Sequence, residues 1–136
     1  MKNKAVIAVL TLVLCLSLAI PVFAGSPAKD FDFALNAGGS AYDAGLKTDR
    51  AYHADIYPQG GNVSKSAYLV FDIRKFENDE NGSKYLTYRV ASQDLAPMKI
   101  YYKSSVNMDD IQWNTVRLYA NRYGQGIVTM NGVWYP

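Results

Sequence analysis

The sequence predicts an all-β protein, a single antiparallel β-sandwich of the jelly-roll or immunoglobulin-like type with about seven short strands. Two observations lead to this prediction. After residue 24, apolar and polar residues alternate with a period of two over most of the chain, which is the pattern of strands with one buried face. The segments between these stretches are rich in Gly, Asn, Asp, Ser and Pro, the residues that supply turn geometry. No repeat or linker divides the strands, so residues 25–136 are predicted to form one domain.

The alternating stretches define the predicted strands and their inward faces. In chain order the strands are 31–35, 51–57, 67–74, 84–90, 98–103, 114–120 and 126–130, the last continuing into 133–135. The stretch 67–74 is the richest in apolar residues, which indicates a central strand. The residues expected to face the core are Phe31, Phe33, Leu35, Tyr52, Ala54, Ile56, Ala67, Leu69, Phe71, Ile73, Leu86, Tyr88, Val90, Met98, Ile100, Tyr102, Val116, Leu118 and Ala120.

The stretch Asp109–Asn121 fits two structures. Its acidic start suits a short helix capped by Asp109 or Asp110. The β-branched pair Thr115–Val116 and the alternation that follows favour a strand. We therefore predict a strand.

The chain ends on an aromatic segment, "NGVWYP". Asn131–Gly132 suits either a tight turn or a bulge. Because only four residues follow, we predict a bulge within one continuing strand. Trp134 is then expected to dock in the core, because large aromatic side chains in small domains usually do so.

Residues 1–24 have the three-part layout of a secretory signal peptide. Lys2 and Lys4 precede an apolar run over 5–20, and Pro21 leads to the small-residue site that ends at Ala24. A membrane anchor would need about 20 apolar residues without a cleavage site. We therefore expect cleavage after Ala24 and a protein that is secreted or associated with the cell surface, with no stable membrane span.

Cleavage would also change the composition. The only cysteine, Cys15, lies in the signal segment, so the secreted domain is expected to be free of disulfides. Loss of Lys2 and Lys4 leaves 12 basic against 12 acidic residues. This balance gives no support for a nucleic-acid partner, because such proteins concentrate positive charge.

Catalytic chemistry finds little support in the sequence. His53 is the only histidine, and Asp55 follows it by two residues on the same predicted strand face. A catalytic triad also needs a nucleophile, and a zinc site needs three or four ligands. We therefore interpret His53 as a surface residue and expect no catalytic residue, no cofactor and no enzymatic activity.

The acidic loop after the central strand was tested as a calcium site. Glu77, Asp79 and Asn81 fall at the first, third and fifth positions of a calcium loop, but Tyr88 occupies the twelfth, where a bidentate Glu is needed. A solvated hairpin loop is the favoured interpretation, and weak calcium binding is the alternative.

Tyrosines on the outward faces of the predicted strands suggest a binding surface. Tyrosine beside arginine can stack on sugar rings or anchor a protein partner. The alternative is that the rings only stabilise the sheet through cross-strand pairs. The candidate ligand-binding residues are Tyr68, Tyr85, Tyr101, Tyr119, Arg89 and Arg117, and Tyr57 shares the outward pattern.

Three segments, "FDFAL", "YLVFDIR" and "VRLYANRYGQGIVTMNGVWYP", carry a resemblance. With them the chain resembles small exported all-β proteins of Gram-positive bacteria that have no assigned function, some of them grouped with bacteriocin-like products. It is longer and poorer in histidine than the lactococcin-like peptides. The resemblance implies a secreted β-sandwich and brings no catalytic residues.

Two functional hypotheses follow. The first is a secreted, non-enzymatic binding module that recognises a cell-wall glycan or an envelope protein through an aromatic sheet face. The second is a bacteriocin-like factor that acts on competing cells. A mature charge near zero disfavours electrostatic attack on anionic membranes, so the binding module is the favoured hypothesis.

Overall fold

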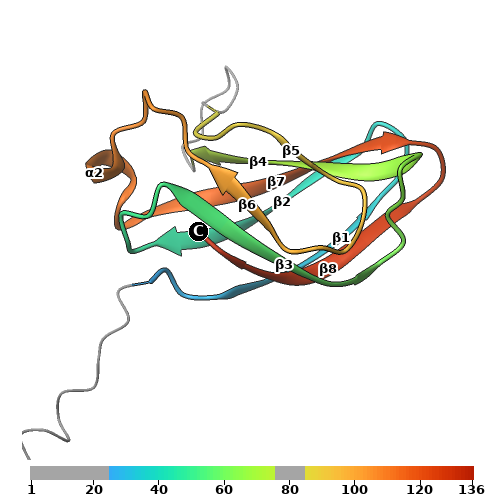
Figure 1. Ribbon diagram of the computed structural model, residues 1–136, viewed down its shortest axis with the longest axis horizontal. Coiled ribbons are helices and arrows are strands. Elements are labelled where there is room, and N and C mark those ends of the chain that lie inside the picture. The colour runs from blue at the N-terminus through green and yellow to red at the C-terminus, as the bar shows by residue number, and fades with distance from the viewer. Residues whose placement is uncertain (1–24, 76–84) are drawn as a thin grey trace, which may run out of the picture.

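Residues 25–75 and 85–136 are described by the computed structural model, and within these ranges the chain forms strands and one short helix (Figure 1). The elements are β1 (Lys29–Leu35), β2 (Ser40–Lys47), β3 (His53–Gly61), β4 (Ala67–Lys75), β5 (Val90–Ser92), β6 (Met98–Tyr101), α2 (Met108–Ile111), β7 (Asn114–Gly124) and β8 (Val128–Tyr135). The prediction of an all-β protein is confirmed, with eight strands in the described ranges rather than about seven.

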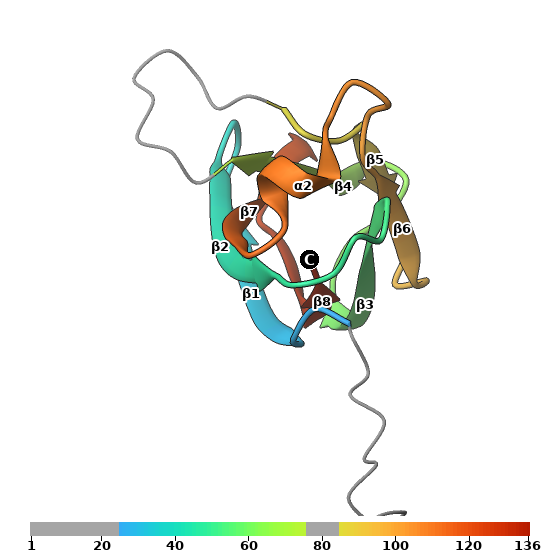
Figure 2. The same cartoon turned by 90° about the vertical axis from the view of Figure 1, so that its left-hand side faces the viewer.

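The strands form two antiparallel sheets of four strands. Sheet A has the order β1-β8-β3-β6, and sheet B has the order β2-β7-β4-β5. Strands from the two halves of the chain pair in nested fashion: β1 with β8, β2 with β7, β3 with β6 and β4 with β5. Each sheet therefore combines strands from the two ends of the chain with strands from its middle. In Figure 2, viewed along the strands, the two sheets enclose a common interior.

The inner faces of the two sheets meet in one apolar core. Phe71 of β4 contacts Phe31 and Phe33 of β1 across the sheets, with ring centroids 6.1 and 6.2 Å apart. The predicted inward faces of β1, β4 and β7 are confirmed, because their apolar residues are buried or packed against the core. The buried core residues are Phe31, Phe33, Leu35, Ala54, Ile56, Leu69, Phe71, Ile73, Leu86, Ile100, Tyr102, Met108, Ile111, Val116, Leu118, Ala120, Val128, Met130 and Trp134.

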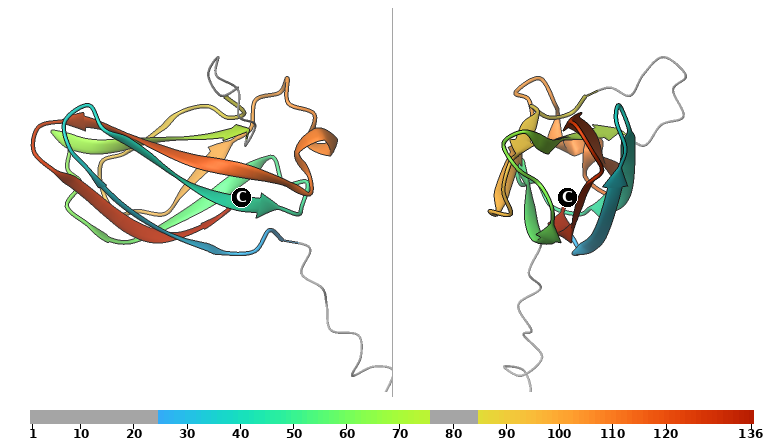
Figure 3. Two further views of the ribbon diagram at one scale, coloured as in Figure 1. Left: turned by 180° about the vertical axis from the view of Figure 1, so that it is seen from behind. Right: turned by 90° about the vertical axis from the view of Figure 1, so that its right-hand side faces the viewer.

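The connections gather at the two ends of the sandwich. The β1–β2, β3–β4 and β7–β8 turns lie at the end opposite α2 (Figures 1 and 3), which we call the turn end. Helix α2 lies at the other end, the helix end. Different side chains therefore lie at the helix end and at the turn end of the core.

The last strand is held as predicted. β8 runs without interruption from Val128 to Tyr135 and pairs with β1 in one register. Trp134 is fully buried, which confirms its docking. The irregularity lies in the partner strand instead, because the register of β3 against β8 shifts between Pro58 and Gly60. Gly132 is required beside it, since a Cβ there would lie 2.4 Å from the carbonyl oxygen of Tyr57.

Strand β2 is a strand that the sequence analysis missed. Its sequence, "SAYDAGLK", lacks regular apolar alternation, and the preceding Gly-rich segment indicated only a turn. Its partner β7 holds it in place through a continuous ladder from Ser40 to Lys47. At Gly45 a Cβ would lie 3.0 Å from the Trp134 ring. The small residue that weakens the strand pattern is therefore the one that lets Trp134 pack.

The predicted strand over 84–90 is wrong in its extent. Only isolated bridges form at Tyr85 and Thr87, and the regular strand β5 begins at Val90. Thr87, not Tyr88, faces inward, because the Thr87 hydroxyl accepts a 2.8 Å hydrogen bond from the Ile73 N–H. Tyr88 is exposed, and so is Tyr52, which precedes β3.

The stretch Asp109–Asn121 contains both of the structures considered. Met108–Ile111 forms the one-turn helix α2, capped by Asn107, whose side chain accepts a 3.1 Å hydrogen bond from the Asp109 N–H. Trp113 then turns the chain with a φ of 65°, and β7 begins at Asn114. The strand prediction is therefore wrong for the first five residues, Asp109 to Trp113, and correct from Asn114 onward.

Candidate functional site

The outer face of sheet B carries a cluster of tyrosine and arginine side chains. Residues on β2, β7 and β4 that share this face lie opposite one another: Tyr42 is opposite Tyr119, and Tyr119 is opposite Asp72. One step along, Arg74 lies opposite Arg117 on one side and bridges to Tyr85 on the other. We call this surface the arginine–tyrosine face, and it comprises Tyr42, Asp72, Arg74, Tyr85, Arg89, Arg117 and Tyr119.

Asp72 lies at the centre of the arginine–tyrosine face and is fully buried although it points outward from β4. Its carboxylate accepts a 2.6 Å hydrogen bond from Arg74 Nε and a longer one, 3.4 Å, from Arg74 Nη2. Arg89 Nε lies 3.6 Å from the second oxygen, and Asn121 donates to the same oxygen at 3.5 Å. A buried carboxylate with several donors fixes the side chains around it, since an unpaired charge would be costly there.

The guanidinium group of Arg74 contacts two tyrosine rings. Its guanidinium carbon lies 3.8 Å from the centre of the Tyr119 ring and 4.5 Å from that of Tyr85. Burial alone would lower the pKa of Arg74, but the hydrogen bond and charge of Asp72 outweigh that effect and raise it. Arg74 therefore stays charged and remains hydrogen-bonded to Asp72, with its guanidinium group in cation–π contact with both rings.

Two more cation–ring contacts extend the face on either side. Arg89 lies 5.0 Å from the Tyr85 ring and donates a 2.8 Å hydrogen bond to the Tyr85 hydroxyl. Arg117 lies 4.5 Å from the Tyr42 ring, and Tyr42 in turn packs 5.2 Å from Tyr119. The result is a connected row of guanidinium groups and rings in the order Arg117, Tyr42, Tyr119, Arg74, Tyr85 and Arg89. In this row Tyr42 is 51% exposed and Tyr85 is 38% exposed.

The structure places five of the six predicted ligand-binding residues on the outer face of sheet B. Tyr85, Tyr119, Arg89 and Arg117 belong to the arginine–tyrosine face. Tyr68 is on the same side of β4, but six residues from Arg74, which is about 20 Å along a strand. It stacks on Tyr123 with ring centroids 5.6 Å apart.

Tyr101, the sixth predicted residue, lies on the outer face of sheet A, as does Tyr57. The outward tyrosines therefore do not share one surface, because β3 and β6 belong to sheet A whereas β4 and β7 belong to sheet B. The sequence analysis also missed Tyr42, since it lies on the unpredicted strand β2. Asp72 and Arg74 lie on the same face, and the alternation of β4 predicted that both point outward. It could not predict which rings of the other strands they would contact.

The outer face of sheet A has a smaller polar cluster around His53. Its Nε2 lies 3.2 Å from Lys99 Nζ and 3.3 Å from Asp55, and Lys99 lies 3.6 Å from Asp55. The His53 ring is 5.8 Å from that of Tyr101. Within residues 25–75 and 85–136, no hydroxyl or thiol group hydrogen-bonds to His53, so the arrangement of a nucleophile with its base is not formed there.

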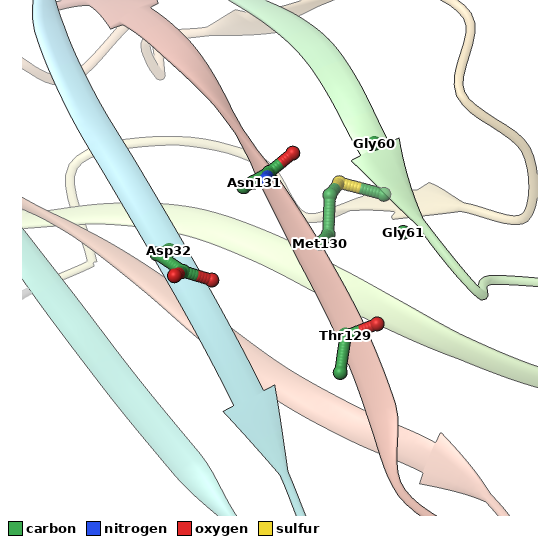
Figure 4. Close-up of a pocket in the computed structure, with 6 residues that line it drawn as sticks. All are labelled: Asp32, Gly60, Gly61, Thr129, Met130 and Asn131. Atoms are coloured by element: carbon green, nitrogen blue, oxygen red, sulfur yellow. The ribbon is translucent and has the colours of Figure 1, made fainter.

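A shallow polar hollow lies at the other end of β3 from this cluster (Figure 4). Asp32 and Asn131 face each other across β1 and β8, and Thr129 lies one step along β8. Gly60 and Gly61 of β3 leave its third side open. The hollow is small, about 80 Å³, so it offers polar contacts to a ligand group but does not enclose one.

Metal and membrane sites were also considered. In the described part of the chain, no three His, Cys, Asp or Glu side chains are grouped to hold a metal ion. The calcium candidate, Glu77, Asp79 and Asn81, lies outside the described residues. None of the helices in the described ranges has the length and apolarity to cross a membrane.

Comparisons with family models, with curated proteins and with solved structures find no match to this chain.

Proposed function

We propose that the protein is a secreted, non-enzymatic binding module that recognises a glycan or protein of the cell envelope through the arginine–tyrosine face. Export rests on the signal peptide predicted over residues 1–24, with cleavage after Ala24. The resemblance to small exported proteins of Gram-positive bacteria suggests the envelope as the place of action. The domain that remains after cleavage is the two-sheet unit described above.

One observation carries this proposal: Arg74 is fixed between Tyr85 and Tyr119 by the buried carboxylate of Asp72. Rings and guanidinium groups held in one arrangement lose little conformational freedom when they bind, which favours affinity. Flat rings offer stacking contacts to sugar rings, and tyrosine and arginine are the side chains enriched at the centres of protein interfaces. Both ligand classes therefore fit the surface.

The same contacts also stabilise the sheet, so a binding role has to be separated from a structural one. The test is retention of the purified domain on peptidoglycan, on wall polysaccharide and on extracted envelope proteins. Tyr85→Ala and Tyr42→Ala remove exposed rings of the face. Tyr101→Ala, on sheet A and 55% exposed, is the matched control.

We expect the two face variants to weaken binding by about tenfold or more, as is usual for central aromatic residues of an interface. Tyr101→Ala should bind as the wild type does. Thermal unfolding of each variant shows whether it is folded. Equal retention of all three variants on every ligand preparation would rule out the arginine–tyrosine face as the binding surface.

The bacteriocin-like alternative makes different predictions. It requires that the purified protein inhibit growth of related bacteria and cause leakage from liposomes. The binding module predicts neither effect. The two hypotheses are therefore separated by one leakage assay with vesicles that contain anionic lipid, run at the protein concentrations used for the retention experiment.

A further inference from the structure

The core holds one buried cationic side chain at each end. Lys47, the last residue of β2, lies at the helix end and is fully buried. Arg122, near the end of β7, lies at the turn end and is 6% exposed. Figure 3 shows the turn end, where β7 passes into β8, facing the viewer in its right-hand panel. The two cations have very different surroundings.

Lys47 has two hydrogen-bond acceptors for its ammonium group. Its ammonium group lies 2.7 Å from the carboxylate of Asp49 and donates a 3.0 Å hydrogen bond to the main-chain oxygen of Pro136. It also lies 5.0 Å from the centre of the Tyr102 ring. These partners offset the loss of hydration, as a buried charge requires.

Arg122 has no such partners. It faces inward because it follows the alternation of Val116, Leu118 and Ala120 along β7. Its Nε and Nη2 atoms are closed to solvent and have no hydrogen-bond partner among the described residues. No ion pair joins its guanidinium group to a described carboxylate. Arginine remains charged at any physiological pH, so Arg122 cannot lower the free-energy cost of its burial by losing a proton.

The two unpaired nitrogens of Arg122 share one edge of its guanidinium plane. Nη2 is the terminal nitrogen on the same side as the Nε hydrogen, so their N–H bonds point in parallel. This edge makes paired hydrogen bonds with the two oxygens of a carboxylate. A water molecule offers one oxygen to such an edge, whereas a carboxylate offers two oxygens and the opposite charge.

Turns at the turn end cover Arg122. The Arg122 N–H donates a 3.1 Å hydrogen bond to Gly39, so the β1–β2 turn lies against this residue. Hydrogen bonds join the β3–β4 turn to the β7–β8 turn. The Asn62 side chain donates to the carbonyl oxygen of Ile127 at 2.9 Å and accepts from the N–H of Thr129 at 2.7 Å. Movement of the β1–β2 turn would therefore open the route to the guanidinium edge.

Apolar side chains lie at the same end of the molecule. Ile127, in the β7–β8 turn, is 59% exposed. A ligand with a carboxylate and an apolar body would meet this side chain at the turn end. Tyr123 and Tyr68 stack on each other at the same end but on the outer face of sheet B, away from the Arg122 side chain.

We propose that the turn end of the sandwich is a carboxylate-binding site with Arg122 as its anchor. The ligand inserts its carboxylate beside Nε and Nη2, and the β1–β2 turn yields to admit it. This site is separate from the arginine–tyrosine face and does not depend on the function proposed for that face.

Thermal unfolding of the domain, titrated with simple anions at constant ionic strength, tests the proposal. The probes are sodium acetate, sodium glucuronate and sodium phosphate, with sodium chloride and glucose as the references. A ligand that binds only the folded state raises the midpoint of unfolding with its concentration. We expect a saturable rise with both carboxylates, none with glucose, and a smaller rise with phosphate.

Two variants identify the residue responsible. Arg122→Met keeps a long apolar side chain but removes the guanidinium group, so acetate should no longer raise its unfolding midpoint. Without any anion it should be at least as stable as the wild type, because it removes an unpaired buried charge. Arg50→Met is the matched control, since Arg50 is an exposed arginine at the helix end that pairs with Asp109, and it should keep the response.

A measurement on the wild type guards against failure of a variant to fold. The Nε–H resonance of Arg122 in a nitrogen-15 spectrum should shift on addition of acetate. The proposal is overturned if neither carboxylate raises the unfolding midpoint of the wild type, if Arg50→Met loses the response equally, or if phosphate acts while acetate does not. An unchanged Arg122 resonance at saturating acetate would overturn it as well.

Discussion

The indole N–H of Trp134 donates a 2.8 Å hydrogen bond to the carboxylate of Asp43. Trp134 belongs to β8 of sheet A and Asp43 to β2 of sheet B, so this bond joins the two sheets near the end of the chain. Trp134 is fully buried, and Gly45 of β2 leaves the space for its ring. The final strand is therefore fixed both by its ladder and by a link to the opposite sheet.

Replacement of Trp134 by Phe should destabilise the fold. The variant keeps most of the ring packing but leaves Asp43 without its indole donor, and hydrogen bonds to charged groups contribute about 1.5–3 kcal/mol. The free energy of unfolding is measured by urea denaturation. Trp134→Phe, Asp43→Ala and the double variant form a cycle, and additive effects of the two changes would show that the bond contributes nothing.

Lys47→Met should be among the most destabilising substitutions at the helix end. Methionine nearly matches the volume of lysine, but the change leaves the Asp49 carboxylate and the Pro136 oxygen without the ammonium group. Removal of one partner of a buried ion pair costs about 3–5 kcal/mol. The same urea experiment measures it, with the exposed residue Lys99→Met as the control. A loss no larger than that of the control would contradict the prediction.

Acid should weaken the fold through Asp49. Burial alone would raise the pKa of Asp49, but hydrogen bonds from Lys47 and from the N–H groups of Ser26 and Ala51 together lower it below its ordinary value of 3.8. The stabilisation is therefore complete well above pH 3.8 and is lost as the pH falls below that value. Unfolding midpoints measured from pH 7 to pH 2 should fall more steeply for the wild type than for Asp49→Asn. Parallel curves would exclude Asp49 as the source.

Alkali should weaken the fold through Tyr102. Burial, with a smaller contribution from the charge of Asp49, raises the pKa of the Tyr102 phenol above its ordinary value of 10.0. The folded state keeps a proton that the unfolded chain loses, so stability is complete below pH 10.0 and decreases above it. Tyr102→Phe should flatten this alkaline decline, as measured by unfolding midpoints between pH 8 and pH 11.5. An equal decline in both proteins would disprove the assignment.

The reach of sequence reasoning differs from strand to strand. Where apolar residues alternate strongly, as in Leu69, Phe71 and Ile73 of β4, the pattern predicted both the strand and its inward face. Where a strand depends on its partners, the pattern failed. β2 contains Gly45 and the buried Lys47, and no local rule predicts an inward lysine whose acceptors come from Asp49 and from the end of β8.

The candidate sites show the same division. Alternation alone placed Tyr85, Tyr119 and Arg89 outward, because the side-chain period of a strand is a local property. It could not say that Tyr101 belongs to the other sheet, since the distribution of strands between sheets depends on pairings between distant segments.

The sequence by itself determined that the chain after residue 24 is a cysteine-free β protein, which strands have apolar faces, and that Trp134 lies in the core. Only the tertiary structure decided which strands are neighbours, and so which distant groups meet: Asp72 with Arg89 and Asn121, Lys47 with the main-chain oxygen of Pro136, and Arg122 with no partner among the described residues. The physical reason is range. Periodicity is a property of a few consecutive residues, whereas a buried charge is stabilised by groups that pairing brings from distant parts of the chain.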